Sequence, residues 1–207
     1  MSNNYRNMMM FALACLLMLG SVSGARAQEW YGAATWQISI PSGDTKDFVN
    51  STSFGGFGLD FRKVVKPKTT AGFMAGWNIF HERRTGTDAF GDVTVTGTQD
   101  RYINAFPLMV NVHRYFGERR GTQLYMGLNA GGFIVLQKFA LGVWAVKDDT
   151  WDWGLAPEVG VIFPMQSGAG FMINARYNWS PTAQDLTGND VDLTYWGINI
   201  GFVWEQY

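Results

Sequence analysis

Histidine is the side chain best suited to acid–base chemistry near neutral pH, and the sequence has two, His81 and His113. A serine hydrolase or acyltransferase needs such a base within hydrogen-bond reach of a serine. In an extended segment, residues two positions apart share a face; these are Ile79 for His81, and Asn111 and Tyr115 for His113. Neither face supplies a serine. We therefore expect no catalytic site and assign His113 a hydrogen-bonding role, while partners from other segments remain an alternative.

The composition excludes several classes of protein. The 207 residues include one cysteine, Cys15, which together with two histidines offers no metal-ligand spacing, so no metal and no cofactor is expected. Hydrophobic residues reach 47% and the formal net charge is -1, which excludes a disordered chain and a basic nucleic-acid-binding protein. A mean hydropathy of -0.06 argues against a helical membrane protein. Charged residues make up only 16%, so apolar residues must alternate with small and polar ones.

Residues 1–27 have the three parts of a secretory signal peptide. A polar start carries Arg6, residues 8–22 are apolar, and Ala25 and Ala27 form a small-x-small cleavage pattern. The apolar stretch has about 15 residues, fewer than the roughly 20 that a transmembrane helix needs. Cleavage after Ala27 is expected to leave one domain, residues 28–207, which has no cysteine and therefore no disulfide.

Alternation of apolar and polar residues with period 2 recurs along the rest of the chain. It predicts eight β-strands, at residues 30–40, 54–64, 70–81, 101–115, 123–135, 151–163, 171–179 and 193–204. Short turns follow the second, fourth and sixth strands, whereas longer polar stretches such as 41–53, 82–100 and 181–192 follow the first, third, fifth and seventh. Tight turns at one end and loops at the other are typical of an outer-membrane barrel.

Each predicted strand has one apolar face and one face of glycine, asparagine and charge. In the last strand Trp196, Ile200 and Phe202 share a face, and Tyr195 and Asn199 lie on the other. A polar face rich in small residues suits a crowded barrel interior better than a solvated surface. Two aromatic girdles are also expected, at the loop end and the turn end: Trp77, Tyr102, Trp151, Trp153, Trp179 and Trp196, and Phe116, Phe163, Phe171 and Trp204. A soluble sandwich or barrel is the alternative.

The last strand carries the most local signal, because residues 195–202 are similar to the polar-x-Gly-x-x-hydrophobic-x-hydrophobic pattern read by the barrel assembly machinery. Tyr195, Gly197, Ile200 and Phe202 occupy its positions, although residues 203–207 follow where the pattern usually closes the chain. The mature chain thus resembles the small eight-stranded outer-membrane β-barrels, such as the outer-membrane protein A transmembrane domain and the OmpX and opacity-protein group. The resemblance implies an all-β, eight-stranded antiparallel up-and-down transmembrane β-barrel, monomeric, in the outer membrane of Gram-negative-type cells.

An eight-stranded barrel is just wide enough for side chains to fill it. The polar faces therefore predict a structural lumen network of Asp60, Arg62, Asn111, His113, Asn129, Glu158, Arg176 and Asn199. A turn centred near Ser167 places Glu158 opposite Arg176, where the two can form a bidentate bridge. We expect this pair to be structural rather than a gate, because a filled lumen leaves no pore.

The predicted loops carry mixed charges, among them Arg83 and Arg84. Such loops are usually solvated connections. The alternative for Arg83 and Arg84 is a contact with outer-membrane lipid, in particular lipopolysaccharide, because guanidinium groups attract phosphates. The chain is expected to be a non-enzymatic, porin-like envelope protein with a structural or surface-interaction role. A narrow channel or conduit for small molecules, including hydrophobic ones, and a lipid A-modifying enzyme stay open as alternatives.

Overall fold

The computed structural model of the chain describes residues 30–90, 93–118, 121–141, 144–165, 168–184 and 190–206. The predicted signal segment, residues 1–27, lies outside them. The described elements are, in chain order, β1 (Trp30–Pro41), α2 (Gly43–Phe48), β2 (Ser53–Lys66), β3 (Thr69–Phe90), β4 (Val93–Phe116), β5 (Gln123–Leu141), β6 (Trp144–Pro164), β7 (Ala169–Gln184) and β8 (Asp190–Gln206). Across these ranges, no helix is both long enough and apolar enough to cross a membrane.

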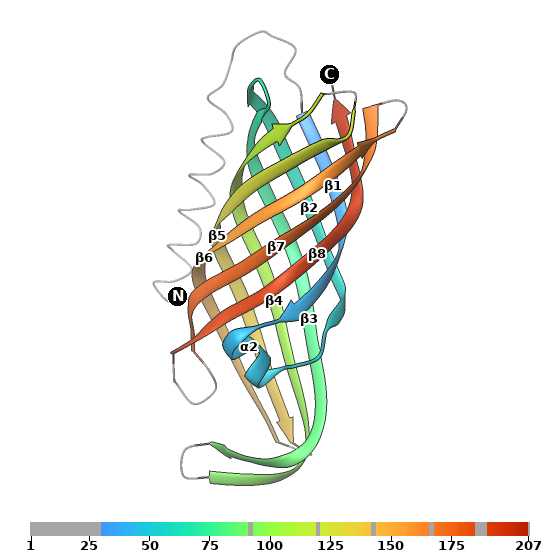
Figure 1. Cartoon of the computed structure of the whole chain (residues 1–207). Coiled ribbons are helices and arrows are strands. Elements are labelled where there is room, and N and C mark those ends of the chain that lie inside the picture. The colour runs from blue at the N-terminus through green and yellow to red at the C-terminus, as the bar shows by residue number, and fades with distance from the viewer. Residues whose placement is uncertain are drawn as a thin grey trace.

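The strands form a closed up-and-down barrel (Figure 1). Each pairs antiparallel with the next, and β8 returns to pair with β1 over the whole length of β1. Glycine permits this closure at Gly201, which faces Thr35: a Cβ added there would lie 2.0 Å from the carbonyl oxygen of Ala34. The predicted fold class and all eight predicted strands are confirmed.

The predicted loop at residues 82–100 is wrong. Strands β3 and β4 stay paired out to Phe90 and Val93, and their ends form the curved arm at the foot of the barrel (Figure 1). Threonine hydroxyls face each other across this arm, Thr85 with Thr98 at 3.1 Å and Thr87 with Thr96 at 2.8 Å. Threonine favours extended backbone, so this segment is polar because water reaches it and not because it lacks strand structure.

Two other predicted loops are also shorter than expected. The 41–53 stretch contains α2, which begins at Gly43, a residue with a φ of +50° that glycine adopts readily. Strand β7 continues to Gln184 and β8 begins at Asp190, within the predicted 181–192 loop. The four strands β3 to β6 are therefore taller at the loop end than β7, β8, β1 and β2.

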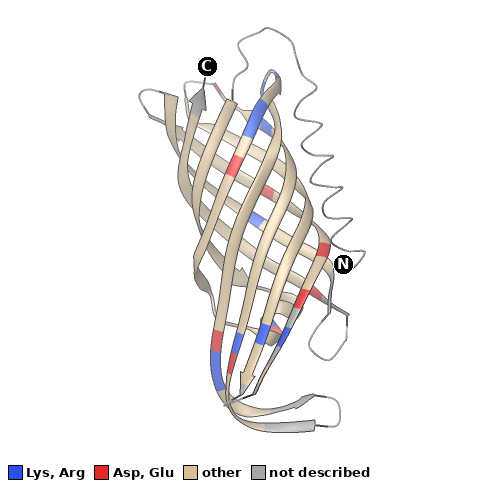
Figure 2. Cartoon of the chain, turned by 180° about the vertical axis from the view of Figure 1, so that it is seen from behind, with Lys and Arg blue, Asp and Glu red and all other residues tan. Residues whose placement is uncertain are grey.

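The wall of the barrel has its apolar side outward. Phe57 is 48% exposed, Leu124 60%, Val159 58% and Phe202 59%. The alternate residues of the same strands point into the lumen and are buried, as Arg62 and Glu158 are. Charged residues are rare over the middle of the wall and gather towards its ends, most clearly at the loop end of β3 to β6 (Figure 2). The predicted assignment of apolar and polar faces is thus what the structure shows.

Candidate functional site in the barrel lumen

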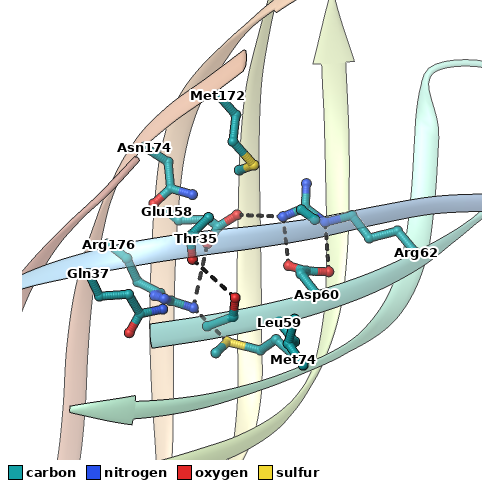
Figure 3. A pocket seen from close by; sticks show the side chains of 12 residues that line it. Thr35, Gln37, Leu59, Asp60, Arg62, Met74, Glu158, Met172, Asn174 and Arg176 are labelled. Atoms are coloured by element: carbon teal, nitrogen blue, oxygen red, sulfur yellow. Dashed lines mark hydrogen bonds and ion pairs between the residues drawn. The ribbon is translucent and has the colours of Figure 1, made fainter. Parts of the chain in front are cut away.

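Arg62 lies at the centre of a polar network inside the barrel (Figure 3). Its Nε and Nη2 atoms donate to the two carboxylate oxygens of Asp60 at 2.9 and 2.7 Å. Its Nη1 donates to the Tyr115 hydroxyl at 3.0 Å, and Nη2 also lies 3.3 Å from Oε1 of Glu158. Asp60 and Arg62 are two positions apart on β2, so both point inward and can form this bidentate pair.

Glu158, on β6, is the second acid of the network. Its Oε1 lies 2.6 Å from Nε2 of His113, and its Oε2 accepts from Nδ2 of Asn129 at 3.4 Å. Arg176 stands opposite Glu158 in the strand register, as predicted, but its Nη1 is 4.0 Å from Oε2. The predicted ion pair is thus present, but its bidentate geometry is not, because Asn129, His113 and Arg62 lie closer to the carboxylate oxygens.

Asparagines extend the network around the lumen. Nδ2 of Asn111 donates to Oδ1 of Asp60 at 3.2 Å. Asn199 donates to Oδ1 of Asn174, and Asn174 in turn donates to the Tyr125 hydroxyl at 2.9 Å. The eight predicted lumen residues all lie inside the barrel, each between 0% and 9% exposed. Asn174 and the two tyrosines that complete the network were not in the predicted set.

The network balances its own charge. Asp60 and Glu158 carry two carboxylates, and Arg62 and Arg176 carry two guanidinium groups. A buried charge without a partner costs several kcal/mol, whereas a paired and hydrogen-bonded one is tolerated. The arrangement therefore links β2 to β6 across the lumen and β6 to its neighbour β7, and it needs no bound ion to remain neutral.

The structure also brings together three potential metal donors. One ligand atom each from Asp60, His113 and Glu158 lie within 4.8 Å of one another. Spacing in the sequence did not predict this group, because the residues come from three strands. Nη2 of Arg62 lies between the two carboxylates, at 2.7 and 3.3 Å, and supplies the positive charge there. A cation at this point would have to displace that guanidinium group.

A small cavity lies beside the polar network. Asp60, Arg62, Glu158 and Arg176 line it together with Met74 and Met172 (Figure 3). Its volume of about 10 Å³ is room for about one water molecule. This cavity is too small for a solute larger than water.

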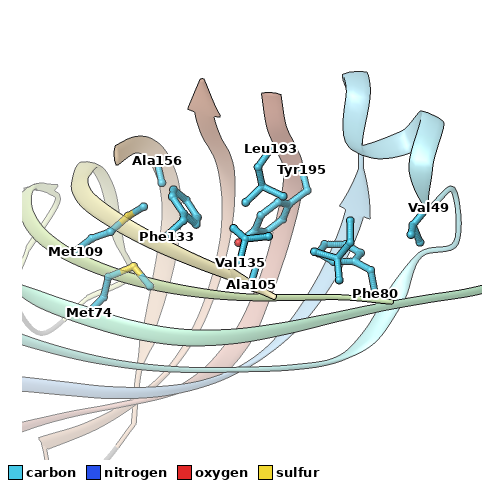
Figure 4. Packing of buried hydrophobic residues seen from close by; sticks show 11 residues of the cluster. Val49, Met74, Phe80, Ala105, Met109, Phe133, Val135, Ala156, Leu193 and Tyr195 are labelled. Atoms are coloured by element: carbon cyan, nitrogen blue, oxygen red, sulfur yellow. The ribbon is translucent and has the colours of Figure 1, made fainter. Parts of the chain in front are cut away.

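Apolar side chains fill the lumen towards the loop end, and sequence reasoning missed this layer (Figure 4). Phe80 and Phe133 are completely buried, and their rings point into the lumen rather than outward. The signal was present, since the β4 sequence from Ala105 to Val110 is apolar on both faces. The cluster consists of Val49, Met74, Phe80, Ile103, Ala105, Met109, Phe133, Val135, Ala156, Leu193 and Tyr195. A second cluster closes the turn end: Tyr31, Ala33, Tyr115, Tyr125, Ile162, Met172 and Val203.

Helix α2 holds the β1–β2 connection against the apolar cluster at the loop end. Thr45 accepts from the Thr194 backbone N–H at 2.7 Å and donates to the Asp192 carbonyl at 3.3 Å. Arg101 donates to the Phe48 carbonyl at 3.0 Å and lies over the Phe48 ring at 5.1 Å. These contacts fix the end of α2 so that the next residue, Val49, is fully buried in the cluster.

Comparison with solved structures finds a similar fold in several outer membrane proteins. A major outer membrane protein from Thermus thermophilus superposes with a TM-score of 0.56 at 11% identity, over 87% of this chain and all of that one. OprG from Pseudomonas aeruginosa gives a TM-score of 0.52 at 15% identity, over 90% of this chain and all of that one. The E. coli outer membrane protein W gives a TM-score of 0.50 at 13% identity, over 88% of this chain and all of that one. No family model and no curated protein sequence matches the chain.

The chain has the fold of the small eight-stranded outer-membrane β-barrels.

The residues of the expected assembly signal divide between the two faces of β8. Tyr195 is 1% exposed and its hydroxyl accepts from Asn78 inside the lumen at 3.2 Å, whereas Phe202 is outside. Gly197 follows Tyr195 on the inner face, and Ile200 precedes Phe202 on the outer face.

The structure does not join Arg83 and Arg84 in one surface. Both lie in β3, where consecutive residues point to opposite faces. Arg83 points outward, with its Nε 3.8 Å from Oδ1 of Asp100, while Arg84 lies on the same face as the buried Phe80. The expectation of one paired lipid contact assumed a loop, and the strand separates the two side chains.

Neither histidine of the barrel is assembled with a serine. His113 bonds Glu158, and His81 stacks on Tyr102 at 4.2 Å with Nε2 3.4 Å from Oδ1 of Asp100. Within the described ranges, no serine hydroxyl is hydrogen-bonded to either ring. Each histidine thus has an acidic neighbour, but the nucleophile of a serine-type site is not brought to it.

Proposed function

We propose that the chain is an integral outer-membrane protein whose lumen is closed by its own side chains. The observation that carries this proposal is the reversed exposure of the barrel wall. Large apolar residues such as Leu124 and Phe202 are more than half exposed, while the charges of Arg62 and Glu158 are buried. In water this would leave an unusually large apolar belt uncovered, whereas in a bilayer the same belt is solvated by lipid.

The proposed role is non-enzymatic and lies in envelope structure or in surface contacts of the loop end. Three filled layers support a closed lumen: the apolar cluster at the loop end, the polar network around Arg62, and the tyrosine-rich cluster at the turn end. A continuous channel would have to pass all three. The tall loop end of β3 to β6 is the part of the wall that extends beyond the apolar belt.

Two measurements test the proposal. The purified barrel should require detergent and should migrate differently in boiled and unboiled gel samples, because a closed barrel resists unfolding. Purification as a soluble monomer without detergent would contradict the membrane assignment. In planar bilayers the protein should give no steady single-channel steps, and reproducible steps would contradict the closed lumen and favour a narrow channel instead.

A further inference from the structure

Four side chains form a continuous row across the outer face of strands β3 to β6, at their loop end. His81 on β3 pairs with Tyr102 on β4, Tyr102 with Lys138 on β5, and Lys138 with Lys147 on β6. The His81 ring stacks on Tyr102 with an interplanar angle of 10°, and the Lys138 ammonium lies 5.7 Å from the centre of the same ring. Both lysines are exposed. We call these four residues the cationic row, after its two lysines.

The cationic row lies just beyond the apolar belt. Four residues before His81 along β3, Trp77 stacks on Phe106 at 5.9 Å, and Phe106 continues through Ile134 to Trp151. Four residues of a strand tilted by about 40° rise about 10 Å along the barrel axis. Since aromatic residues lie at the lipid–headgroup boundary, the cationic row is at the level of the headgroups.

Lys138 and Lys147 are the unusual pair in this row. Like charges directly opposite each other on neighbouring strands repel and destabilise the sheet. Two carboxylates lie on the same outer face. Asp149 is two residues from Lys147 along β6, and Asp100 is shared between His81 and Arg83, at 3.4 and 3.8 Å. A phosphate bound between the two ammonium groups would remove their repulsion.

From this geometry we infer that Lys138 and Lys147 bind a phosphate of a phosphorylated glycolipid headgroup, the lipopolysaccharide type, in the outer leaflet. Tyr102 and His81 form the aromatic edge of that site, next to the lysines. The inference rests on the proposed outer-membrane location and makes it more specific. Unlike Arg83 and Arg84, these two lysines are held on one face by the strand register.

The test measures the affinity of the purified full-length barrel for diphosphoryl lipid A in mixed micelles. The Lys138→Gln/Lys147→Gln double variant should bind about 25-fold more weakly, from about fivefold for each lysine near a lipid surface. Lys138→Arg/Lys147→Arg should stay within about threefold of wild type, because it keeps both charges. The control Lys66→Gln/Lys68→Gln removes two exposed charges at the turn end and should bind like wild type.

Three probes separate the sources of phosphate. Dephosphorylated lipid A and phosphatidylglycerol should bind wild type at least tenfold more weakly, and inorganic phosphate should not compete at equal phosphate concentration. The site would be overturned if either lipid bound as tightly as diphosphoryl lipid A, or if inorganic phosphate competed. Unchanged lipid A affinity in Lys138→Gln/Lys147→Gln would overturn it as well. Every variant is first checked for the gel shift between boiled and unboiled samples. If the shift persists while binding is unaffected, only this site fails; if wild type lacks the shift, the proposed function itself fails.

Discussion

The polar network around Arg62 and the apolar cluster around Phe133 close the same lumen by different physical means. The apolar cluster removes hydrocarbon from water and needs only volume and shape. The polar network needs its carboxylates and guanidinium groups to balance, because an unpaired charge at that depth is costly. The apolar cluster is therefore sensitive to the volume that is removed, and the polar network is sensitive to the balance of charge.

This difference teaches how losses in each layer can be compensated. In the polar network, a second substitution that restores the balance of charge should recover stability. In the apolar cluster, no second deletion can restore the lost volume. Both layers also receive residues from many strands, so each ties distant parts of the wall together.

The largest effect is expected from Arg62→Met in the polar network. It leaves the carboxylates of Asp60 and Glu158 facing one remaining guanidinium group, and should lower the free energy of unfolding by about 3–5 kcal/mol. Asp60→Asn/Arg62→Met restores the charge balance and should lose less than Arg62→Met alone. Denaturant titration in detergent micelles, followed by tryptophan fluorescence, measures both. A double variant as unstable as the sum of the two single variants would show that charge pairing is not what holds this layer.

Arg176→Met is the matched comparison for Arg62→Met. Arg176 is equally buried, but its nearest carboxylate oxygen is 4.0 Å away and its Nη1 lies 2.6 Å from the sulfur of Met74. The loss should therefore be smaller than that of Arg62→Met. An equal loss would mean that burial alone, rather than direct pairing, sets the cost.

A graded loss of about 0.5–4 kcal/mol is expected in the apolar cluster from Ile103→Val and Ile103→Ala. Ile103 is 2% exposed and packs among the residues of that cluster. Ile103→Val removes one methylene group and should cost about 0.5–1.5 kcal/mol, while Ile103→Ala should cost about 2–4 kcal/mol. The same titration measures these values. A cost that does not grow with the volume removed would contradict the description of this layer as close-packed.

The two layers also differ in how well the sequence predicts them. Alternation with glycine and asparagine assigned Asp60, Arg62, His113 and Glu158 to the inner face, and the register of β6 and β7 placed Arg176 opposite Glu158. The partners inside the lumen could not be derived this way. Side chains that meet across a closed barrel come from strands that are not neighbours, and their distances depend on the tilt and stagger of the whole wall.

The apolar layer escaped prediction for a different reason. Period-2 reasoning assumes that one face is polar, and in β4 and β5 both faces are apolar towards the loop end, with Ile103 and Phe133 inside. The loop at 82–100 was mistaken for the opposite reason, because threonine, glycine and charged residues occupy both faces over most of that arm. A strand is recognised by alternation only where its two sides meet different surroundings.

The smallest effect is expected where helix α2 meets the apolar cluster. Thr45→Ala removes the hydroxyl that accepts from the Thr194 backbone at 2.7 Å and donates to the Asp192 carbonyl at 3.3 Å. These two hydrogen bonds, one buried and one partly buried, contribute about 1 kcal/mol, so the barrel should remain folded with little change in its unfolding midpoint. The β1–β2 connection alone should become more accessible, seen as faster proteolytic cleavage near Lys46. Thr45→Ser keeps the hydroxyl and should be cleaved like wild type. Cleavage of Thr45→Ala at the wild-type rate would mean that Val49 in the apolar cluster, rather than the Thr45 hydrogen bonds, holds α2 in place.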